Sequence, residues 1–250
     1  MGATVCRAVL DAPGLELVAA VDPTHSGIDL GQLGVRDTSV HVSSKASALK
    51  DAGAEVAIDF TIIDAARENL GWCADNDVHA VVGTTGFTET ELAELAGRFD
   101  RSAANAVIAP NFAIGAILMM RFAELAAPYF ESVEIIELHH DLKKDAPSGT
   151  AVLTAQRIAA ASKDWSDDPT TEVVAEGARG GVVSGIPVHA VRMRGMVASQ
   201  EVLLGTTGQS LSIRHDTYDR SSFMPGVLLA VQKVGATPGL TVGLDALLGL

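Results

Sequence analysis

Short apolar runs alternate with helical patterns through the first half of this 250-residue chain. The runs cover residues 15–21, 56–60, 79–82 and 106–109, and helical patterns at 64–75 and 89–103 separate the later ones. These runs are rich in Val, Ile and Ala, as expected of strands that are covered on both faces. Repeated strand–helix–strand units predict an α/β fold with a doubly wound, mostly parallel sheet, and such sheets bind ligands at the carboxyl ends of their strands.

Two loops at successive strand ends have the composition of a ligand site. Residues 83–87 read Gly-Thr-Thr-Gly-Phe, and residues 109–112 read Ala-Pro-Asn-Phe. Small residues let backbone amides approach a ligand closely, and hydroxyl and amide side chains can bond to it. Each loop alone is equally well read as a tight turn. Together, at neighbouring ends of one sheet, they favour a binding site.

The second half of the chain has a different pattern, which begins after Asn111. A helical pattern at 114–130 precedes a strand-like run at 132–139, and further strand candidates follow at 186–192, 198–206 and 209–215. The last two are expected to form a hairpin around Thr207-Gly208. The polar, Gly-rich stretch at 163–185 reads as connection and surface. Several strands in succession predict a mixed sheet and hence a second, α+β domain.

Two helix starts are marked by their residue types. Thr88 and Glu91 have the spacing of a capping box, which predicts that a helix begins after Thr88. Pro225 stands shortly before an apolar pattern at 227–235, where we expect the last helix.

The densest chemistry lies at residues 137–151, which read Glu-Leu-His-His-Asp-Leu-Lys-Lys-Asp-Ala-Pro-Ser-Gly-Thr-Ala. Side chains alternate along a strand, so Glu137 and His139 share one face and His140 takes the other. Both imidazoles serve one pocket only if the strand ends there and the chain turns. Ser148 is a good helix cap, and the free amides that follow it would form an anion site for a carboxylate or phosphate.

These residue types suit proton donation to a small anion. Histidine titrates near neutrality, and Lys143 can balance a carboxylate or act as a second acid. The alternative is that His139 and His140 are a structural pair bonded to backbone, and that Lys143 and Lys144 form a solvated face. Of the two lysines, we assign Lys144 to solvent.

Composition excludes several classes of protein. The formal net charge of −13 argues against a nucleic-acid partner, because such proteins neutralise phosphates with clustered cations. No apolar run reaches the roughly 18 residues needed to span a bilayer, and the amino terminus lacks the pattern of a secretion signal. Cys6 and Cys73 lack metal-ligand spacing. We therefore expect a soluble, cytoplasmic protein with no membrane partner and no metal.

Residues 137–151 closely resemble the signature E-x-H-H-x-x-K-x-D-x-P-S-G-T-A of the dihydrodipicolinate reductase family. These enzymes, also called 4-hydroxy-tetrahydrodipicolinate reductases, serve the diaminopimelate route to lysine. The similarity extends over nearly the whole chain. It continues through Gly83-Thr84-Thr85-Gly86, Ala109-Pro110-Asn111-Phe112, Gly185-Ile186-Pro187-Val188-His189 and Ser222-Phe223-Met224-Pro225-Gly226.

The resemblance implies a reaction and a set of site residues. NADH or NADPH would deliver hydride to a cyclic dicarboxylate, with His139 as the proton donor and Lys143 assisting. The substrate would be held by His140, Lys143, Ser148, Gly149 and Thr150. The cofactor would contact Gly2, Asp22, Gly83, Thr84, Thr85, Ala109, Pro110, Asn111 and Phe112. Asp22 would face the adenosine ribose and favour NADH, although members often accept both cofactors.

The resemblance also implies an architecture and an assembly. Residues 1–111 and 223–250 would form a Rossmann-like dinucleotide-binding domain that the last helix completes. Residues 112–222 would bind substrate and join four copies into a homotetramer through their sheet.

The chain departs from the family pattern in two places. Members begin with an apolar strand and a turn of the form G-x-x-G-x-x-G, of which only the last glycine, Gly2, is matched here. About ten residues would then be absent, including the first strand of the sheet and the pyrophosphate loop, so we expect a longer natural protein. The second departure is Ser199, where relatives usually have His; we expect it to adjust activity rather than abolish it.

Two other functions compete with the reductase. One is a truncated, cofactor-deficient relative that binds the dicarboxylate without catalysis. The other is a different amino-acid dehydrogenase of similar build, which the histidine-lysine signature disfavours because the fold alone does not choose a substrate.

Overall fold

The computed structural model describes all residues from Met1 to Leu250. The chain divides into two compact units, and each is described by itself. The first unit comprises Met1–Phe112 and Arg220–Leu250, and the second comprises Ala113–Asp219. Phe112 and residues 220–222 fall in the first unit, whereas the sequence had assigned them to the second.

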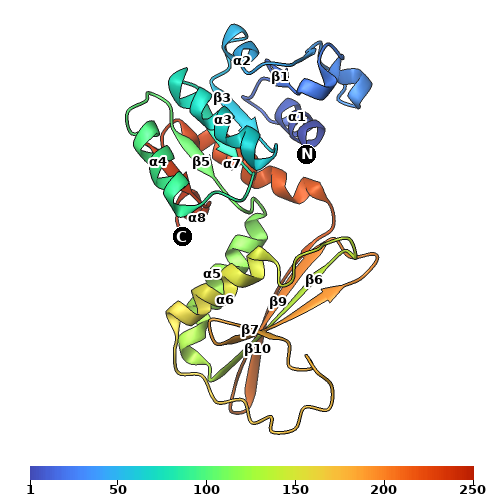
Figure 1. The fold of residues 1–250 in the computed structure, drawn as a ribbon, viewed down its shortest axis with the longest axis vertical. Coiled ribbons are helices and arrows are strands. Elements are labelled where there is room, and N and C mark those ends of the chain that lie inside the picture. The colour runs from blue at the N-terminus through green and yellow to red at the C-terminus, as the bar shows by residue number, and fades with distance from the viewer. The chain divides into compact units, whose positions relative to one another are not determined.

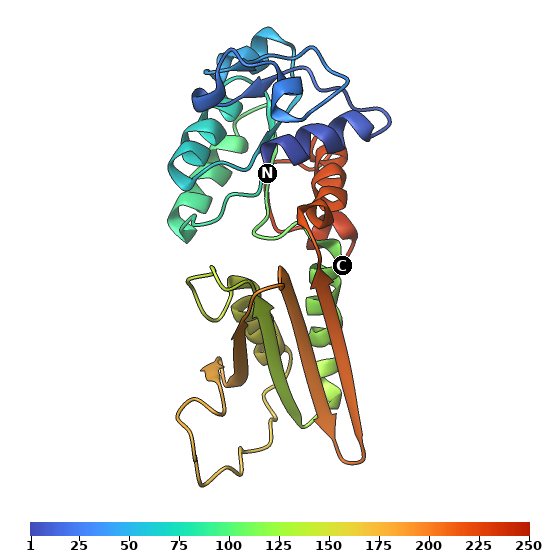
Figure 2. The same ribbon diagram turned by 90° about the vertical axis from the view of Figure 1, so that its right-hand side faces the viewer.

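A four-stranded parallel sheet forms the centre of the first unit, in the order β11-β5-β4-β3. Its strands are β3 (Val56–Asp59), β4 (His79–Val82), β5 (Ala106–Ile108) and β11 (Leu240–Val242). Figures 1 and 2 show α3 (Ile63–Asp75) and α4 (Glu89–Phe99) on one side of it, and α1 (Gly2–Asp11) and α7 (Met224–Val234) on the other. The predicted doubly wound, Rossmann-like sheet is therefore confirmed.

The core of this unit explains the apolar runs. All three residues of β5 are buried, as expected of a central strand with helices on both faces. On α3 the buried residues Ala66, Leu70 and Cys73 recur at helical spacing and pack against β4 and against Phe99. The capping box at Thr88 is confirmed: its hydroxyl accepts from the Glu91 amide, and the Glu91 carboxylate accepts from the Thr88 amide.

The register of the sheet brings its strand ends together. Asp59 is the Cα partner of Val82, and Val82 is the partner of Ile108. The segments that follow β3, β4 and β5 therefore leave the same edge of the sheet side by side. This edge is where ligands of parallel sheets bind.

The strand expected at 15–21 is shorter than predicted. Only β1 (Ala20–Val21) has strand pairing, and its partner β2 (Val42–Ser43) belongs to a separate two-stranded sheet. Residues 15–19 have no neighbouring strand with which to pair, so their apolar character alone does not make them a strand. The outer edge of β3 has no strand beside it.

Three helix boundaries also differ from those expected. Helix α4 ends at Phe99 rather than at residue 103. Beyond this end, the hydroxyl of Ser102 donates a hydrogen bond to the Ala74 carbonyl. Helix α5 (Ile114–Ala126) gives way to a 3₁₀ turn, Ala127–Tyr129, because Pro128 has no N–H to continue the ladder. Helix α7 begins three residues before Val227, at Met224, with Pro225 in its first turn.

The second unit contains a mixed sheet in the order β10-β9-β6-β8-β7, as predicted. The central strand β6 runs parallel to β8 and antiparallel to β9. Its strands are β6 (Ser132–His139), β7 (Gly181–Val183), β8 (Ile186–Arg192), β9 (Ala198–Thr206) and β10 (Gln209–Thr217). The hairpin at Thr207-Gly208 is confirmed. Strand β7 was not predicted, because it is a short, exposed edge strand within a Gly-rich stretch.

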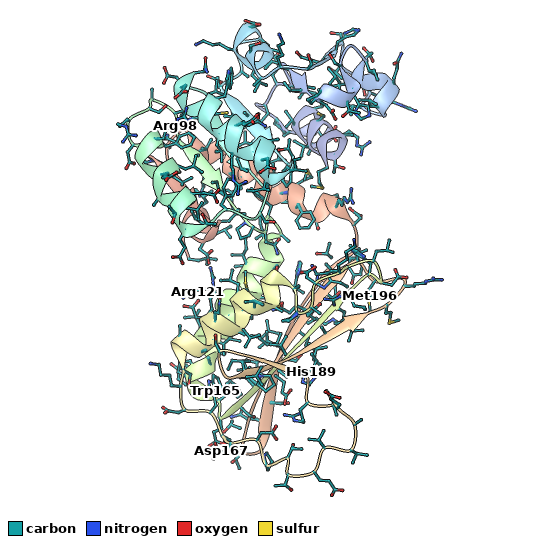
Figure 3. All side chains as sticks on the ribbon, viewed as in Figure 1. Arg98, Arg121, Trp165, Asp167, His189 and Met196 are labelled. Atoms are coloured by element: carbon teal, nitrogen blue, oxygen red, sulfur yellow. The ribbon has the colours of Figure 1, made fainter.

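Helices α5 and α6 (Gly149–Ala161) cover one face of this sheet, and the other face is open (Figure 2). Buried side chains therefore alternate along β6, with Val133, Ile135 and Glu137 turned towards the helices. Trp165, which follows α6, packs against the same core (Figure 3).

The remaining elements are short helices. They are α2 (Ser47–Asp51), α8 (Asp245–Leu248) and the 3₁₀ turns Pro23–His25, Leu30–Leu33 and Arg220–Phe223. No helix combines the length and the apolar character that crossing a bilayer requires.

Candidate active site

The carboxyl end of β6 carries a buried carboxylate beside an imidazole. Glu137 has no exposed surface, and it follows the apolar residues Val133 and Ile135 on the same face of the strand. One of its oxygens, Oε2, lies 2.6 Å from Nδ1 of His139, and the other accepts from the Ser148 amide at 3.0 Å. An ionised carboxylate only accepts, so His139 presents its proton at Nδ1 to Glu137 and leaves Nε2 as the nitrogen that can act elsewhere.

Arg192, at the end of β8, is a site residue that sequence reasoning missed. Its Nη1 and Nη2 donate to the two oxygens of Glu137, each at 2.8 Å, and Nη2 also donates to the Asp145 carbonyl at 2.6 Å. Residues 137 and 192 meet because β6 and β8 are paired strands, with His139 and Arg192 as partners. The available signal was an arginine at the end of a mostly apolar strand.

The hydrogen bonds keep Glu137 ionised. Burial is the largest single influence and raises the pKa of this carboxyl. Hydrogen bonds from His139 and Arg192 together outweigh it, with help from the Ser148 amide, and lower the pKa to about 2.

Ser148 begins α6 as predicted. Its hydroxyl accepts from the Ala151 amide at 3.2 Å, and its own amide is held by Glu137. Gly149 is exposed and Thr150 is half-buried, so the first turn of α6 is accessible from solvent at Gly149. Backbone amides at such a helix start attract a carboxylate.

The loop between β6 and α6 carries the remaining predicted residues. Lys143 contacts both carboxylate oxygens of Asp145 at 2.8 Å, and this hydrogen bond lowers the pKa of Asp145. His140 and Lys144 are exposed, which agrees with the assignment of Lys144 to solvent. Because Asp145 is largely exposed, its pair with Lys143 contributes at most about 1 kcal/mol and can exchange for another anion.

Ser199 lies away from His139. It is the cross-strand partner of Leu138, so it shares the open face of the sheet rather than the face of Glu137 and His139. Its hydroxyl bonds to Asp216 and, after Arg214, is a cause of the lowered pKa of that carboxyl.

The first unit has an open hollow of about 330 Å³ at the carboxyl ends of β3 and β4. It is lined by Phe60, Thr61, Ile62, Ile63, Gly83, Thr84 and Thr85. Glycine is required at 83, because a Cβ there would lie 2.1 Å from Cε1 of Phe60. Three of the predicted cofactor residues therefore meet in one hollow.

Asp59 organises this hollow and was also missed. It is buried at the end of β3, and it accepts from the Thr61 amide at 2.8 Å and from the Asn69 amide group at 2.7 Å. The hydroxyl of Thr84 is shared between Asp59 and the Thr61 carbonyl. The side chain of Thr84 is thus used to hold two loops together. The signal was a carboxylate at the end of an apolar strand.

The other predicted cofactor residues do not line the hollow. Ala109 and Phe112 are buried, and the Phe112 ring packs against Phe60 with centroids 5.6 Å apart. Pro110 is exposed and Asn111 half-buried. Gly2 is exposed at the start of α1.

Asp22 caps the turn that follows β1. It accepts from the Thr24 amide and lies 3.0 Å from Nδ1 of His25, and the bond to His25 lowers the pKa of Asp22. The structure contains no cluster of three or more His, Cys, Asp or Glu side chains that could hold a metal ion.

Two family models cover almost the whole chain. The model for the amino-terminal part of dihydrodipicolinate reductase matches residues 1–112, and the model for its carboxyl-terminal part matches residues 115–248.

Relatives named 4-hydroxy-tetrahydrodipicolinate reductase are similar over most of their length. One from Mycobacterium sp. (strain KMS) is 55% identical over 85% of this chain and 88% of its own. One from Streptomyces avermitilis is 49% identical over 100% of this chain and 94% of its own.

Solved structures share the fold. A dipicolinate-bound dihydrodipicolinate reductase from Paenisporosarcina sp. TG-14 is 40% identical with a TM-score of 0.85, over 97% of this chain and 93% of that one. An amine dehydrogenase from Mycobacterium smegmatis has a TM-score of 0.65 at 15% identity, a likeness of fold alone.

Proposed function

The chain belongs to the dihydrodipicolinate reductase family of NAD(P)H-dependent oxidoreductases, and we propose that it reduces 4-hydroxy-tetrahydrodipicolinate, or the dihydrodipicolinate formed from it, to tetrahydrodipicolinate. The observation that carries this proposal is the end of β6. There an imidazole oriented by a buried carboxylate stands beside the first turn of a helix that is capped by Ser148. That pairing suits a ring that carries carboxylates and must take up a proton.

His139 is the proposed proton donor. Its Nδ1 is bound to Glu137, so the proton leaves from Nε2 as negative charge develops on the conjugated ring. Positioned acids of this kind contribute about 10² to 10⁴ in rate.

The substrate carboxylates are proposed to bind next to this acid. The amides of Gly149 and Thr150 after Ser148, together with His140 and Lys143, supply hydrogen bonds and positive charge. Lys143 reaches a substrate carboxylate by giving up its exposed pair with Asp145.

The residues of the first unit fit a nicotinamide cofactor. Gly83 presents backbone without a Cβ at the carboxyl end of β4, and the hollow beside it is open to solvent. When bound, NADH or NADPH supplies the hydride. Gly83, Thr84 and Thr85 would hold it, and Gly2, Asp22 and the 109–112 loop are proposed as further contacts. The proposal also includes a cytoplasmic location. It further includes a homotetramer that buries the open face of the second unit's sheet. Light scattering would then report a mass near four times 25.9 kDa.

The test is oxidation of NADH or NADPH that depends on freshly made condensation product, followed by loss of nicotinamide absorbance. His139→Gln should lower kcat about 10²-fold or more with a smaller change in KM, because it removes the proton and keeps the shape. His140→Gln should act mainly on KM. His41→Gln, at an exposed histidine of the first unit, is the control and should change neither. Full activity of His139→Gln would contradict the assignment.

A second candidate is a relative that binds the dicarboxylate without catalysis. It is favoured by the unpaired outer edge of β3 and by the separate sheet of β1 and β2, which leave the first unit with four strands in its main sheet. Binding of dipicolinate without any saturable binding of NADH or NADPH would select this candidate over the reductase.

A further inference from the structure

Glu137 has an unusual set of partners for a wholly buried side chain. Its two oxygens accept four hydrogen bonds, from His139, from the Ser148 amide and twice from Arg192. A buried carboxylate is costly unless such bonds satisfy it. Nothing in the packing of the strand requires a charge here, because Val133 and Ile135 precede it on the same face.

Each partner belongs to a different part of the proposed site. His139 is the proposed acid, and the Ser148 amide opens the helix start that would bind a carboxylate. Arg192 reaches on to the Asp145 carbonyl at 2.6 Å, in the loop that carries Lys143. One carboxylate thus links the acid, the anion site and the loop between them.

We propose that Glu137 and Arg192 are a positioning pair. The pair orients the imidazole of His139 so that Nε2 delivers the proton, and it holds the imidazole in a fixed position relative to the first turn of α6. This inference rests on the proposed function and extends it to two residues that would not touch the substrate.

The two members of the pair have distinct tasks. Glu137 selects the tautomer of His139, because an ionised oxygen 2.6 Å from Nδ1 requires a proton on that nitrogen. Arg192 covers both oxygens with its guanidinium and keeps Glu137 ionised, so that the carboxylate accepts from the imidazole without taking its proton. The charged groups connected to His139 are Glu137 on its own strand and, through it, Arg192 on β8.

The same strand offers a matched control on its other face. Glu134 also contacts a histidine and an arginine, His189 and Arg179, the former at 2.5 Å through Nε2. These three residues lie on the open face of the sheet, turned away from Glu137. Glu134→Gln therefore removes the same kind of charge from the same strand without touching the proposed site.

The first measurement is the steady-state rate of the full chain. Glu137→Gln keeps the shape, and its amide oxygen can still accept from Ser148, so we expect kcat to fall about 10²-fold while KM changes less than about threefold. Arg192→Lys loses the two-point contact of the guanidinium with Glu137 and should lower kcat less, by about tenfold. Glu134→Gln should retain kcat and KM.

The second measurement does not depend on activity. Spectra of ¹⁵N-labelled histidine rings, assigned by comparison with His139→Gln, should show the neutral His139 ring protonated at Nδ1 in the wild type and as a tautomer mixture in Glu137→Gln. A wild type with this fixed tautomer but no reductase activity would reject the proposed function and keep the positioning pair.

Three outcomes would overturn the inference. They are an unchanged kcat in Glu137→Gln, an equal fall of kcat in Glu134→Gln, and a His139 tautomer that does not respond to Glu137→Gln. Loss of cooperative unfolding in both Glu137→Gln and Arg192→Lys would likewise reject positioning in favour of a purely structural pair.

Discussion

Replacing Gly83 by alanine should damage the hollow of the first unit through a single methyl group. The added Cβ would lie 2.1 Å from Cε1 and 2.6 Å from Cδ1 and Cζ of Phe60. Carbon atoms in ordinary contact are about 3.5 to 4.0 Å apart, so the ring must recede by roughly 1.5 Å. The buried ring of Phe112, 5.6 Å away between centroids, limits that movement. Overpacking of this kind costs about 1 to 3 kcal/mol.

The same displacement should weaken cofactor binding, because Phe60 and Gly83 both line the hollow. We expect the Kd for NADH, measured by nicotinamide fluorescence, to rise at least about tenfold, which corresponds to about 1.4 kcal/mol. Urea unfolding should show the loss of stability. Dipicolinate binding, assigned to the second unit, should be unchanged.

Gly97→Ala is the matched control in the same unit. Gly97 lies within α4, and its added Cβ would meet only Nη1 of Arg101, at 3.6 Å. Alanine in a helix should stabilise the chain by about 0.5 to 1 kcal/mol and leave NADH binding intact. Gly83→Ala that binds NADH with the wild-type Kd and unfolds at the wild-type urea concentration would refute the reasoning.

Two further predictions concern stability. Because the folded-state pKa of Glu137 is about 2, against 4.5 for an unperturbed carboxyl, its ionised form stabilises the fold above pH about 4.5. That contribution, on the order of 3 kcal/mol, is lost as the pH falls from 4.5 towards 2. Urea unfolding at a series of pH values should therefore show Glu137→Gln to be less stable than the wild type at neutral pH. The difference in free energy of unfolding between the two should become smaller as the pH falls. A difference that does not depend on pH would contradict this prediction. Thr88→Ala removes the capping box of α4 and should cost about 1 kcal/mol, whereas Thr90→Ala, at an exposed position two residues further along, should cost nothing; equal effects would show that the cap is not the cause.

The sheet of the first unit was predictable because strands that are buried on both faces consist of continuous runs of apolar residues. The Thr88 cap and the Thr207-Gly208 turn were predictable for a similar reason, since each depends on residues adjacent in the chain. The run at 15–21 failed because pairing depends on a neighbouring strand, which local composition does not report. Edge strands such as β7 contain too few buried apolar residues to be predicted from the sequence.

The sequence located His139, the proposed acid, and the start of α6 at Ser148, which lie within one stretch of sequence. Its positioning residues were not. Arg192 stands 55 residues from Glu137, and only the pairing of β6 with β8 brings them together. Asp59 was missed for the same reason, because Thr84 and Asn69 reach it from other segments of the fold.

The fate of the hydrogen on the nicotinamide tests the central claim most directly. NADH carrying deuterium at both C4 positions should be incubated with the full chain and freshly made condensation product. Mass spectrometry of the product should then find one carbon-bound deuterium in tetrahydrodipicolinate for each NADH oxidised. Product without deuterium, or NADH oxidised without formation of tetrahydrodipicolinate, would contradict the account.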